Sequence, residues 1–272
     1  MYRTHKQPVG HATRGKTAAV RLRRLDRFLL RTEEPLFRRH TGLWRDAAYI
    51  DLGYGARPTT TLEAAADLRR VNPGLLVIGV EIDPERVAAA APFADERTRF
   101  RRGGFEVPLQ SDESVRCIRA MNVLRQYPED AVDDAYRTML ALLVPGGLLA
   151  EGTSNPSGSR MVVNLVHRAE PGSPSRRRVL FSANLRHALE SPRELQPVLP
   201  KDLIHRVVPG EPIHDFMEAW ERAWLQTHPA ATFGSRVHFA AAGHALMAAR
   251  GDVEHRPSLL RQGYLVWRPP QQ

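Results

Sequence analysis

The sequence contains a single cysteine and no long apolar run, and each of these two shortages excludes a class of protein. With Cys117 alone, no intramolecular disulfide can form, and no metal site can be built from several cysteines. A radical mechanism that needs a cysteine-held cluster is excluded for the same reason. The longest apolar runs, residues 75–80 and 162–166, fall far short of the roughly 20 residues that cross a bilayer, so we expect no membrane contact.

The first ten residues also lack the apolar segment of a secretory signal, so the cytoplasm is the expected location. A content of 42% hydrophobic and 25% charged residues is that of an ordinary globular protein. At 272 residues the chain can bury one sizeable core and carry an appended subdomain. The spacing of its histidines and acids matches no zinc pattern, so we expect no metal.

The basic residues are almost all arginines, and their excess over acids lies at the N-terminus. Residues 1–40 hold eleven basic side chains against three acids. Such a block attracts phosphate-bearing partners and makes their association depend on salt, which favours RNA as a partner. The alternative is a solvated helix face with no partner.

This N-terminal region, residues 1–45, is predicted to be a basic helical arm. Apolar residues recur in it near helical spacing, with arginines between them, so we expect a helix that docks on the body through its apolar stripe. The stripe consists of Val20, Leu22, Leu25, Phe28 and Leu29. Residues 10–15 precede it without a clear pattern and are expected to be a loop or a flexible tail.

Residues 46–155 alternate between strand and helix patterns, which predicts an α/β fold with a mostly parallel sheet. A capping box at Thr60 and Glu63 is expected to start the first helix, and Asp83 before Pro84 is expected to cap the second. The expected strands are 47–52, 75–82, 98–102, 115–122 and 148–152, and the expected helices are 60–71, 84–91 and 128–143.

Residues 156–272 are expected to complete the same domain with antiparallel edge strands and helical elements. The ranges 161–167 and 177–185 read as a hairpin, and 263–267 as a last strand. Between them, aromatic and aliphatic residues at helical spacing predict a helix whose aromatics belong to the core. These residues are Ile213, Phe216, Trp220 and Trp224.

The first predicted strand ends on Asp51 and breaks into a turn with two glycines, Gly53 and Gly55. Glycines let a ligand approach the backbone, and the following helix offers unpaired amide donors, so the pattern favours a nucleotide-type cofactor. A nicotinamide fingerprint needs a third glycine where this chain has Pro58, which argues against a dehydrogenase.

An acid followed by G-x-G at the end of the first strand resembles motif I of the class I S-adenosylmethionine-dependent methyltransferases. The resemblance extends through four further segments in order, and it covers about residues 46–153. The four segments are Val-Ile-Gly-Val-Glu-Ile-Asp-Pro at 77–84, Gly-Phe-Glu-Val-Pro-Leu at 104–109, Ala-Met-Asn-Val-Leu at 120–124 and Leu-Val-Pro-Gly-Gly-Leu-Leu at 143–149. It implies a Rossmann-like sheet, S-adenosyl-L-methionine as cofactor and methyl transfer as the reaction.

The resemblance also implies roles for single residues. Asp51 would hold the amino group of the cofactor, while the turn of Gly53, Tyr54 and Gly55 would pass beside its methionine part. Glu81 would accept hydrogen bonds from both ribose hydroxyls. The alternative is that Asp83 binds the ribose and Glu81 caps a helix.

Three further residues complete the implied site. Ile82 would pack on the adenine, whose edge would be read near Phe105, and Asn122 would line the methyl-transfer cleft. Because the sulfonium is already activated, the resemblance does not single out a catalytic residue, and the candidates are Asn122, Lys201 and His205.

The methyl acceptor is expected to be RNA because of the basic arm, with a small metabolite or a protein as alternatives. Residues 122–125 read Asn-Val-Leu-Arg, which is neither the motif for methylation of exocyclic amines nor the acidic pair of a polyamine synthase. Cys117 lies mid-strand and is expected to pack in the core rather than attack a pyrimidine. A non-catalytic, cofactor-binding protein with the same fold is the remaining alternative, and residues 156–272 are expected to form an acceptor-binding cap.

Overall fold

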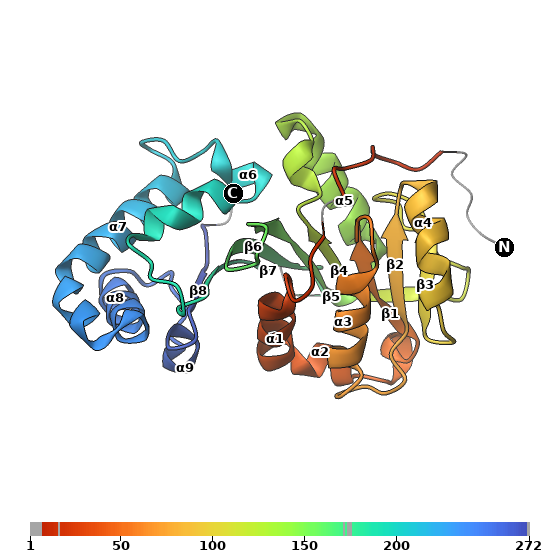
Figure 1. The fold of residues 1–272 in the computed structure, drawn as a ribbon, viewed down its shortest axis with the longest axis horizontal. Helices are drawn as coiled ribbons and strands as arrows, with labels where there is room; N and C mark the ends of the chain where they lie inside the picture. The colour runs from red at the N-terminus through yellow and green to blue at the C-terminus, as the bar shows by residue number, and fades with distance from the viewer. Residues whose placement is uncertain (1–6, 16, 171, 173–175, 271–272) are drawn as a thin grey trace. The chain divides into compact units, whose positions relative to one another are not determined.

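The computed structural model describes residues 7–15, 17–170, 172 and 176–270, which form two compact units (Figure 1). The described residues within 1–151, 156–158 and 166–176 make up the first unit, and those within 152–155, 159–165 and 177–272 make up the second. The helices are α1 (Arg23–Thr32), α2 (Glu34–Arg38), α3 (Thr59–Leu68), α4 (Pro84–Ala90), α5 (Val132–Leu142), α6 (Lys201–Ile204), α7 (Pro212–Gln226), α8 (Ser235–Ala249) and α9 (Pro257–Leu260). The strands are β1 (Ala47–Leu52), β2 (Val77–Glu81), β3 (Thr98–Arg102), β4 (Ser114–Met121), β5 (Leu143–Ser154), β6 (Arg160–His167), β7 (Arg176–Ala183) and β8 (Tyr264–Trp267).

The strands form one sheet in the order β3-β2-β1-β4-β5-β6-β7-β8. β1 pairs in parallel with β2 and with β4, and β2 pairs in parallel with β3. β7 and β8 pair antiparallel at the other edge. The predicted α/β class, a mostly parallel sheet with antiparallel edge strands, is therefore confirmed. The order of connection reverses between β1 and β4, which is the point where open α/β sheets bind ligands beyond the carboxyl ends of their strands.

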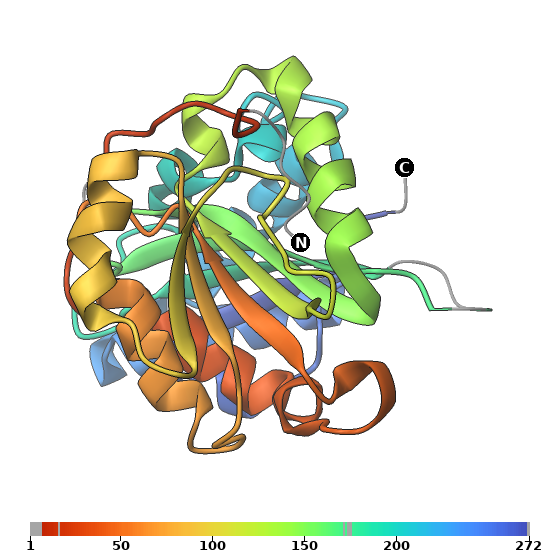
Figure 2. The same ribbon diagram turned by 90° about the vertical axis from the view of Figure 1, so that its right-hand side faces the viewer.

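Helices cover both faces of the parallel part of the sheet (Figure 2). α3 and α4 pack on one face against β2 and β3, and α5 contacts β4 from the opposite face. Every residue of β1 and β2 is buried, which explains why these strands read as continuous apolar runs instead of alternating ones.

The predicted docking helix is α1, and its apolar stripe is buried except at one residue. Leu25, Phe28 and Leu29 are at most 1% exposed and α1 packs on α3, as the helical spacing predicted. Val20 was expected in the stripe but is 45% exposed, because α1 begins only at Arg23.

Two local predictions about the helices were wrong. Thr60 and Glu63 form no capping box, because α3 starts one residue earlier behind Pro58 and Glu63 accepts the backbone N–H of Val20 instead. α5 starts at Val132, after a short 3-10 turn at Glu129–Ala131, and not at residue 128. By contrast, Asp83 caps α4 as predicted, accepting the N–H groups of Glu85 and Arg86.

β5 is longer than predicted. It runs from Leu143 to Ser154 and passes through Pro145 and the two glycines that were expected to stop α5 outside any strand. Gly146 has φ +79°, a conformation that glycine adopts without strain, so the chain turns there without leaving the strand.

A buried arginine ties the start of β1 to the segment before it. The guanidinium of Arg116 on β4 donates to five backbone carbonyls and contacts no carboxylate among the described residues; the acceptors belong to Leu36, Phe37, Arg39, Trp44 and Ala47. Burial lowers the pKa of Arg116 to about 10. These bonds satisfy carbonyls around the end of α2 that no helix neighbour can reach.

The second unit has its own core. Phe216, Trp220 and Trp224 on α7 are at most 2% exposed and pack with Phe239 of α8 and Trp267 of β8. Phe216 stacks on Trp267 with ring centroids 4.7 Å apart. The aromatics of residues 213–224 are therefore core residues, as their spacing predicted. Within the described part of the chain, no helix is both long and apolar enough to span a membrane.

Candidate functional site

The candidate site lies where β1 and β4 end side by side, at the reversal of strand order. The turn after β1 places Gly53 at φ +71° and Gly55 at φ +85°. A Cβ on Gly53 would lie 2.6 Å from Cγ2 of Val123, which follows β4. Only glycine fits this crossing, so the G-x-G pattern is explained by the packing of the turn as well as by space for a ligand.

A small pocket opens at this point, within the first unit. Its cavity volume is about 20 Å³, room for little more than one water molecule. It is lined by the ends of β1 and β2, the loop after β3, the loop after β4 and the N-terminal segment; the lining residues are Val9, His11, Thr13, Leu52, Gly53, Val80, Glu81, Ile82, Gly103, Gly104, Phe105, Val123 and Tyr127.

Four of the residues implied as cofactor ligands line this pocket. They are Gly53, Glu81, Ile82 and Phe105. The other four implied for the cofactor, Asp51, Tyr54, Gly55 and Asn122, do not line it.

Glu81 ends β2 and is 1% exposed. Its Oε1 accepts the backbone N–H of Ile82 at 3.0 Å, and its Oε2 accepts that of Gly55 at 2.9 Å. Nη1 of Arg86 lies 3.5 Å from Oε1. The carboxylate is thus fixed between the glycine turn and the start of α4. Asp83 and not Glu81 caps α4, while the assignment of a ribose to either carboxylate stays a prediction.

Asp51 is held in the core behind the turn. Its Oδ1 accepts from Nε of Arg119 at 3.0 Å, and its Oδ2 accepts from the hydroxyl of Thr61 at 2.7 Å. The hydroxyl of Thr60 donates to Oδ2 as well, at 3.1 Å. In this arrangement the carboxylate of Asp51 fastens β1 to β4 and α3.

Arg119 also pairs with Asp26 of α1, with 2.5 Å between Nη1 and Oδ1. Burial raises the pKa of Asp26 to about 6, although the guanidinium of Arg119 works against this shift. Burial alone would lower the pKa of Arg119, but Asp26 and Asp51 hold that pKa well above its usual value. The three side chains form a buried acid–arginine–acid group at the base of the site.

Tyr54 turns away from the pocket toward β2 and β3. Its ring contacts that of Phe100 edge-on at 5.5 Å, and it fills the space that a side chain at Gly79 would need. Its hydroxyl donates to the carbonyl of Arg86 at 3.4 Å. Tyr54 therefore packs the turn against the sheet.

The N-terminal segment 9–15, called the strap here, crosses the pocket. The carbonyl of Val9 accepts the N–H of Phe105 at 3.1 Å, and the N–H of Val9 donates to Glu106. The hydroxyl of Tyr127 accepts the N–H of His11 at 2.7 Å and donates to its carbonyl at 3.0 Å. The ring of His11 stacks on that of Tyr127, with 3.9 Å between centroids.

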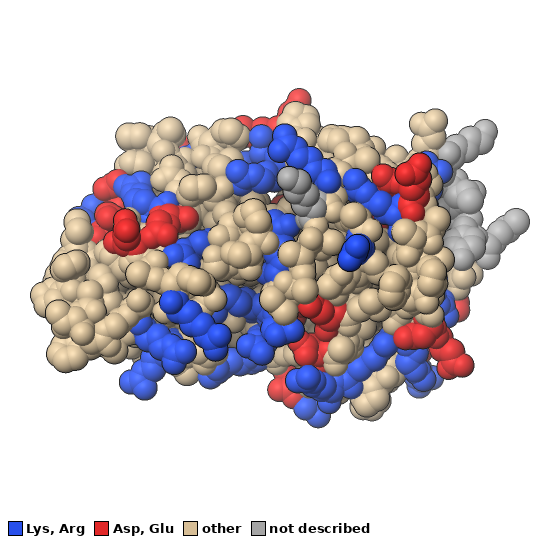
Figure 3. All heavy atoms as spheres, in the orientation of Figure 1, with Lys and Arg blue, Asp and Glu red and all other residues tan. Residues whose placement is uncertain are grey.

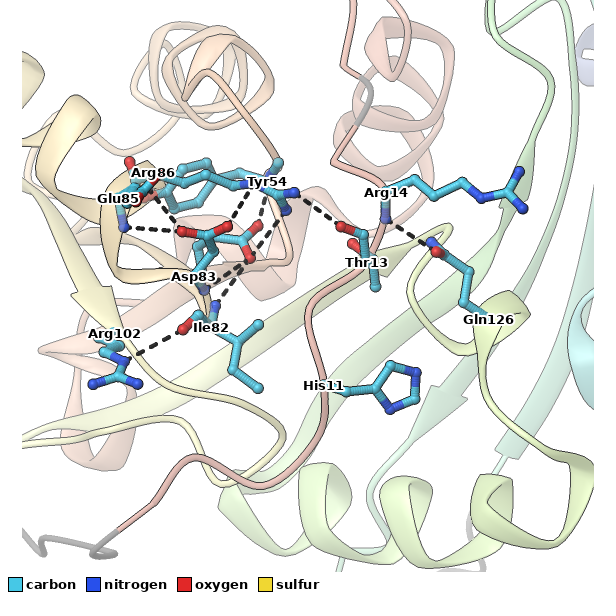
Figure 4. Close-up of polar contacts among 12 residues, drawn as sticks. His11, Thr13, Arg14, Tyr54, Ile82, Asp83, Glu85, Arg86, Arg102 and Gln126 are labelled. Carbon is cyan, nitrogen blue, oxygen red and sulfur yellow. Dashed lines mark hydrogen bonds and ion pairs between the residues drawn. The ribbon is translucent and has the colours of Figure 1, made fainter.

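The second half of the strap is held from both sides (Figure 4). Nη2 of Arg86 donates to the carbonyl of Thr13 at 2.9 Å, and the N–H of Arg14 donates to the side chain of Gln126 at 3.0 Å. The carbonyl of Gly15 accepts the N–H of Ala56 at 2.9 Å and blocks any Cβ on Gly55. Sequence reasoning missed the strap because its contacts are mostly made by the backbone, and only Gly10 and Gly15 marked it.

The candidate catalytic residues fall in different parts of the chain. Asn122 directly follows β4 in the left-handed conformation, at φ +62°. Lys201 and His205 belong to the second unit, where Nζ of Lys201 lies 3.2 Å from Nε2 of His205 at α6. Among the described residues, no three histidines, cysteines or acids gather as they would around a metal ion.

Comparison with known proteins finds partial similarities of fold. No family model matches the chain, and no curated protein matches it. The N-methyltransferase NodS from Bradyrhizobium japonicum matches at 17% identity, over 50% of this chain and 69% of that chain, with a TM-score of 0.33. Magnesium protoporphyrin IX methyltransferase from Synechocystis matches at 16% identity, over 49% and 54%, with a TM-score of 0.36.

A third match is an S-adenosylmethionine-dependent methyltransferase from Mesorhizobium loti. It has 20% identity, over 46% of this chain and 54% of that chain, and a TM-score of 0.32. These three solved structures are methyltransferases. This chain spans between 27% and 69% of the length of the first matched structures.

Proposed function

We propose that the protein binds S-adenosyl-L-methionine in the pocket at the ends of β1 and β2 and catalyses methyl transfer from it. The observation that carries the proposal is the placement of Glu81. A carboxylate that is 1% exposed lines a pocket at the reversal of strand order, beside a glycine turn that only glycine can form. A buried acid there suits the two neighbouring hydroxyls of a ribose.

The remaining lining fits the other parts of such a cofactor. Ile82 and Phe105 offer apolar surface for an adenine ring, and the loop at Gly103 and Gly104 brings backbone close to the pocket. A Cβ on Gly104 would clash with the carbonyl of Val9 at 1.9 Å, so this loop and the strap already touch. Because the cavity holds about 20 Å³, the strap must shift to admit a cofactor.

The reaction in this proposal depends on placement. The sulfonium of the cofactor supplies an activated methyl group, and the residues of this chain orient the donor and exclude water. The strap suits the second task, since it covers the pocket through contacts with Phe105, Tyr127 and Arg86. Asn122 remains the candidate beside the methyl group, and Lys201 and His205 remain candidates for contact with the acceptor.

Two measurements test the proposal. Titration calorimetry with S-adenosylmethionine should show binding at one site per chain, and incubation with methyl-labelled donor and cell extract should label a product. Binding without label transfer to any RNA, protein or metabolite would support the non-catalytic alternative. Absence of binding to both S-adenosylmethionine and S-adenosylhomocysteine would refute the cofactor assignment.

RNA as the acceptor rests on the basic arm, and the structure suggests how to test it. Basic side chains are spread over much of the face seen in Figure 3. Arg27 and Arg31 are exposed on α1, so changing both to glutamine leaves the buried face of that helix intact. If the arm binds RNA, the double variant should lower the slope of affinity against salt by about 2. An unaltered slope would mean that the arm is structural.

A further inference from the structure

A second, larger cavity in the first unit lies beside the strap and is lined by arginines. Its volume is about 460 Å³, within the range of small-molecule sites. Arg14, Arg21 and Arg57 line it, and Thr17, Ala18 and Ala56 are further lining residues. Among the residues that the structure describes, no acid lines this cavity. Its chemistry is therefore that of a site for a negatively charged group.

Two of these arginines have guanidinium groups available for a ligand. Within the described ranges, neither Arg14 nor Arg57 forms an ion pair with a carboxylate, and both are exposed. Figure 4 shows the side chain of Arg14 extending away from the cluster around Arg86, without a contact to the residues drawn. Arg21, the third lining arginine, is half buried, and this burial lowers its pKa.

Hydrogen bonds hold the backbone around the cavity in the structure without cofactor. Arg14 is anchored through its N–H to Gln126, and the next residue, Gly15, through its carbonyl to Ala56. Ala56 and Arg57 stand just before Pro58, the residue from which α3 starts.

Successive parts of the strap line the proposed cofactor pocket and this cavity. His11 and Thr13 line the pocket, whereas Arg14, Gly15 and Thr17 line the arginine cavity. The two sites are therefore neighbours along the strap, at Thr13 and Arg14.

We propose that the cavity of Arg14, Arg21 and Arg57 binds the phosphate or carboxylate group of a small-molecule methyl acceptor. That the ligand is a methyl acceptor rests on the proposed methyl transfer. The binding of an anion in the cavity does not depend on the cofactor. A cavity of about 460 Å³ has the size of a site for a small acid, whereas an RNA strand needs an extended basic groove along its backbone.

The test is a titration of the full-length protein, without cofactor, with inorganic phosphate in one arm and succinate in another. The variants are Arg14→Gln and Arg57→Gln, and the control is Arg70→Gln, which removes a 79% exposed arginine just past the other end of α3. At least one anion should bind, about tenfold more weakly to each cavity variant, because one charge-assisted hydrogen bond is lost. The control should bind both anions like the wild type. Whichever of phosphate and succinate binds more tightly identifies the kind of anion that the cavity takes.

Several results would overturn the proposal. Equal binding by wild type and Arg57→Gln, or equal weakening by Arg70→Gln, would mean that anions bind without using the cavity. Weaker S-adenosylmethionine binding by Arg57→Gln would assign the arginines to the cofactor instead. If a 16-nucleotide RNA loses affinity in Arg57→Gln while neither small anion binds, the site takes RNA. A protein that binds the anion but no cofactor would refute the proposed function and leave the anion site standing.

Discussion

Arg119 and Asp51 form a buried ion pair between adjacent strands, with 2.9 Å between Nη2 and Oδ2. They are directly paired residues of β4 and β1, and neither side chain is more than 3% exposed. The pair lies immediately behind the glycine turn, and Arg119 extends it to Asp26 on α1. The position of the turn is thus coupled to the docking of the N-terminal helix.

This group predicts an unusual pH dependence. Because the folded-state pKa of Asp26 is raised to about 6 from its ordinary value of 3.8, the folded protein binds more protons than the unfolded chain between these pH values. Asp26 therefore makes the protein more stable as pH falls from about 6 toward 4, by about 3 kcal/mol at most.

Urea unfolding of the wild type and of Asp26→Asn at pH 4, 5, 6, 7 and 8 measures this contribution. The difference between their unfolding free energies should change with pH between 4 and 6 and become constant above 7. A difference that stays constant from pH 4 to 7 would show that Asp26 titrates normally in the folded state.

Arg116 provides a prediction about stability alone. Replacing it with methionine leaves five carbonyls without their donor, so Arg116→Met should lower the free energy of unfolding by about 3 to 5 kcal/mol. Arg116→Lys keeps the charge but reaches fewer carbonyls, so its free energy of unfolding should lie between those of the wild type and Arg116→Met. Chemical denaturation measures both, and a loss below about 1 kcal/mol for Arg116→Met would contradict the role of these bonds.

The strap should loosen when its bonds to Tyr127 are removed. Tyr127→Phe loses both hydrogen bonds to the backbone of His11, and the N–H of His11 loses its acceptor. Hydrogen exchange in residues 9–15 should then speed up by about tenfold, the effect of roughly 1.4 kcal/mol. Tyr136→Phe is the matched control, because the hydroxyl of Tyr136 donates to Glu151 on β5 and not to the strap. Unchanged exchange in Tyr127→Phe would mean that other contacts hold the strap.

The parallel part of the fold could be predicted because each strand is short, apolar and bounded by turn residues. The bounds of β1 and β3 were predicted to the residue, since turn residues follow both strands. Asp83 was identified as the cap of α4 because a proline follows it. β5 was predicted too short, because a Pro-Gly-Gly run normally breaks a strand but here is absorbed within one through the positive φ of Gly146.

The candidate site was only partly predictable. Glu81 and Gly53 were found because strand ends and glycine turns leave a sequence pattern, and both line the pocket. The partner of Asp51 was not foreseen, because Arg119 is distant in sequence and an arginine in the middle of an apolar strand does not reveal what it contacts. The strap was missed since its hydrogen bonds come from backbone groups that every residue possesses.

The central claim is that Glu81 lies where a ribose binds, and titration calorimetry with S-adenosylmethionine tests it most directly. Glu81→Ala should weaken binding by about 1.5 to 3 kcal/mol, because buried hydroxyls lose their acceptor, and Glu85→Ala, an exposed acid on α4, should bind like the wild type. Glu81→Gln keeps an acceptor for the N–H of Gly55 and should fall between them. Equal affinity in the wild type and Glu81→Ala, or no binding by the wild type, would contradict the account.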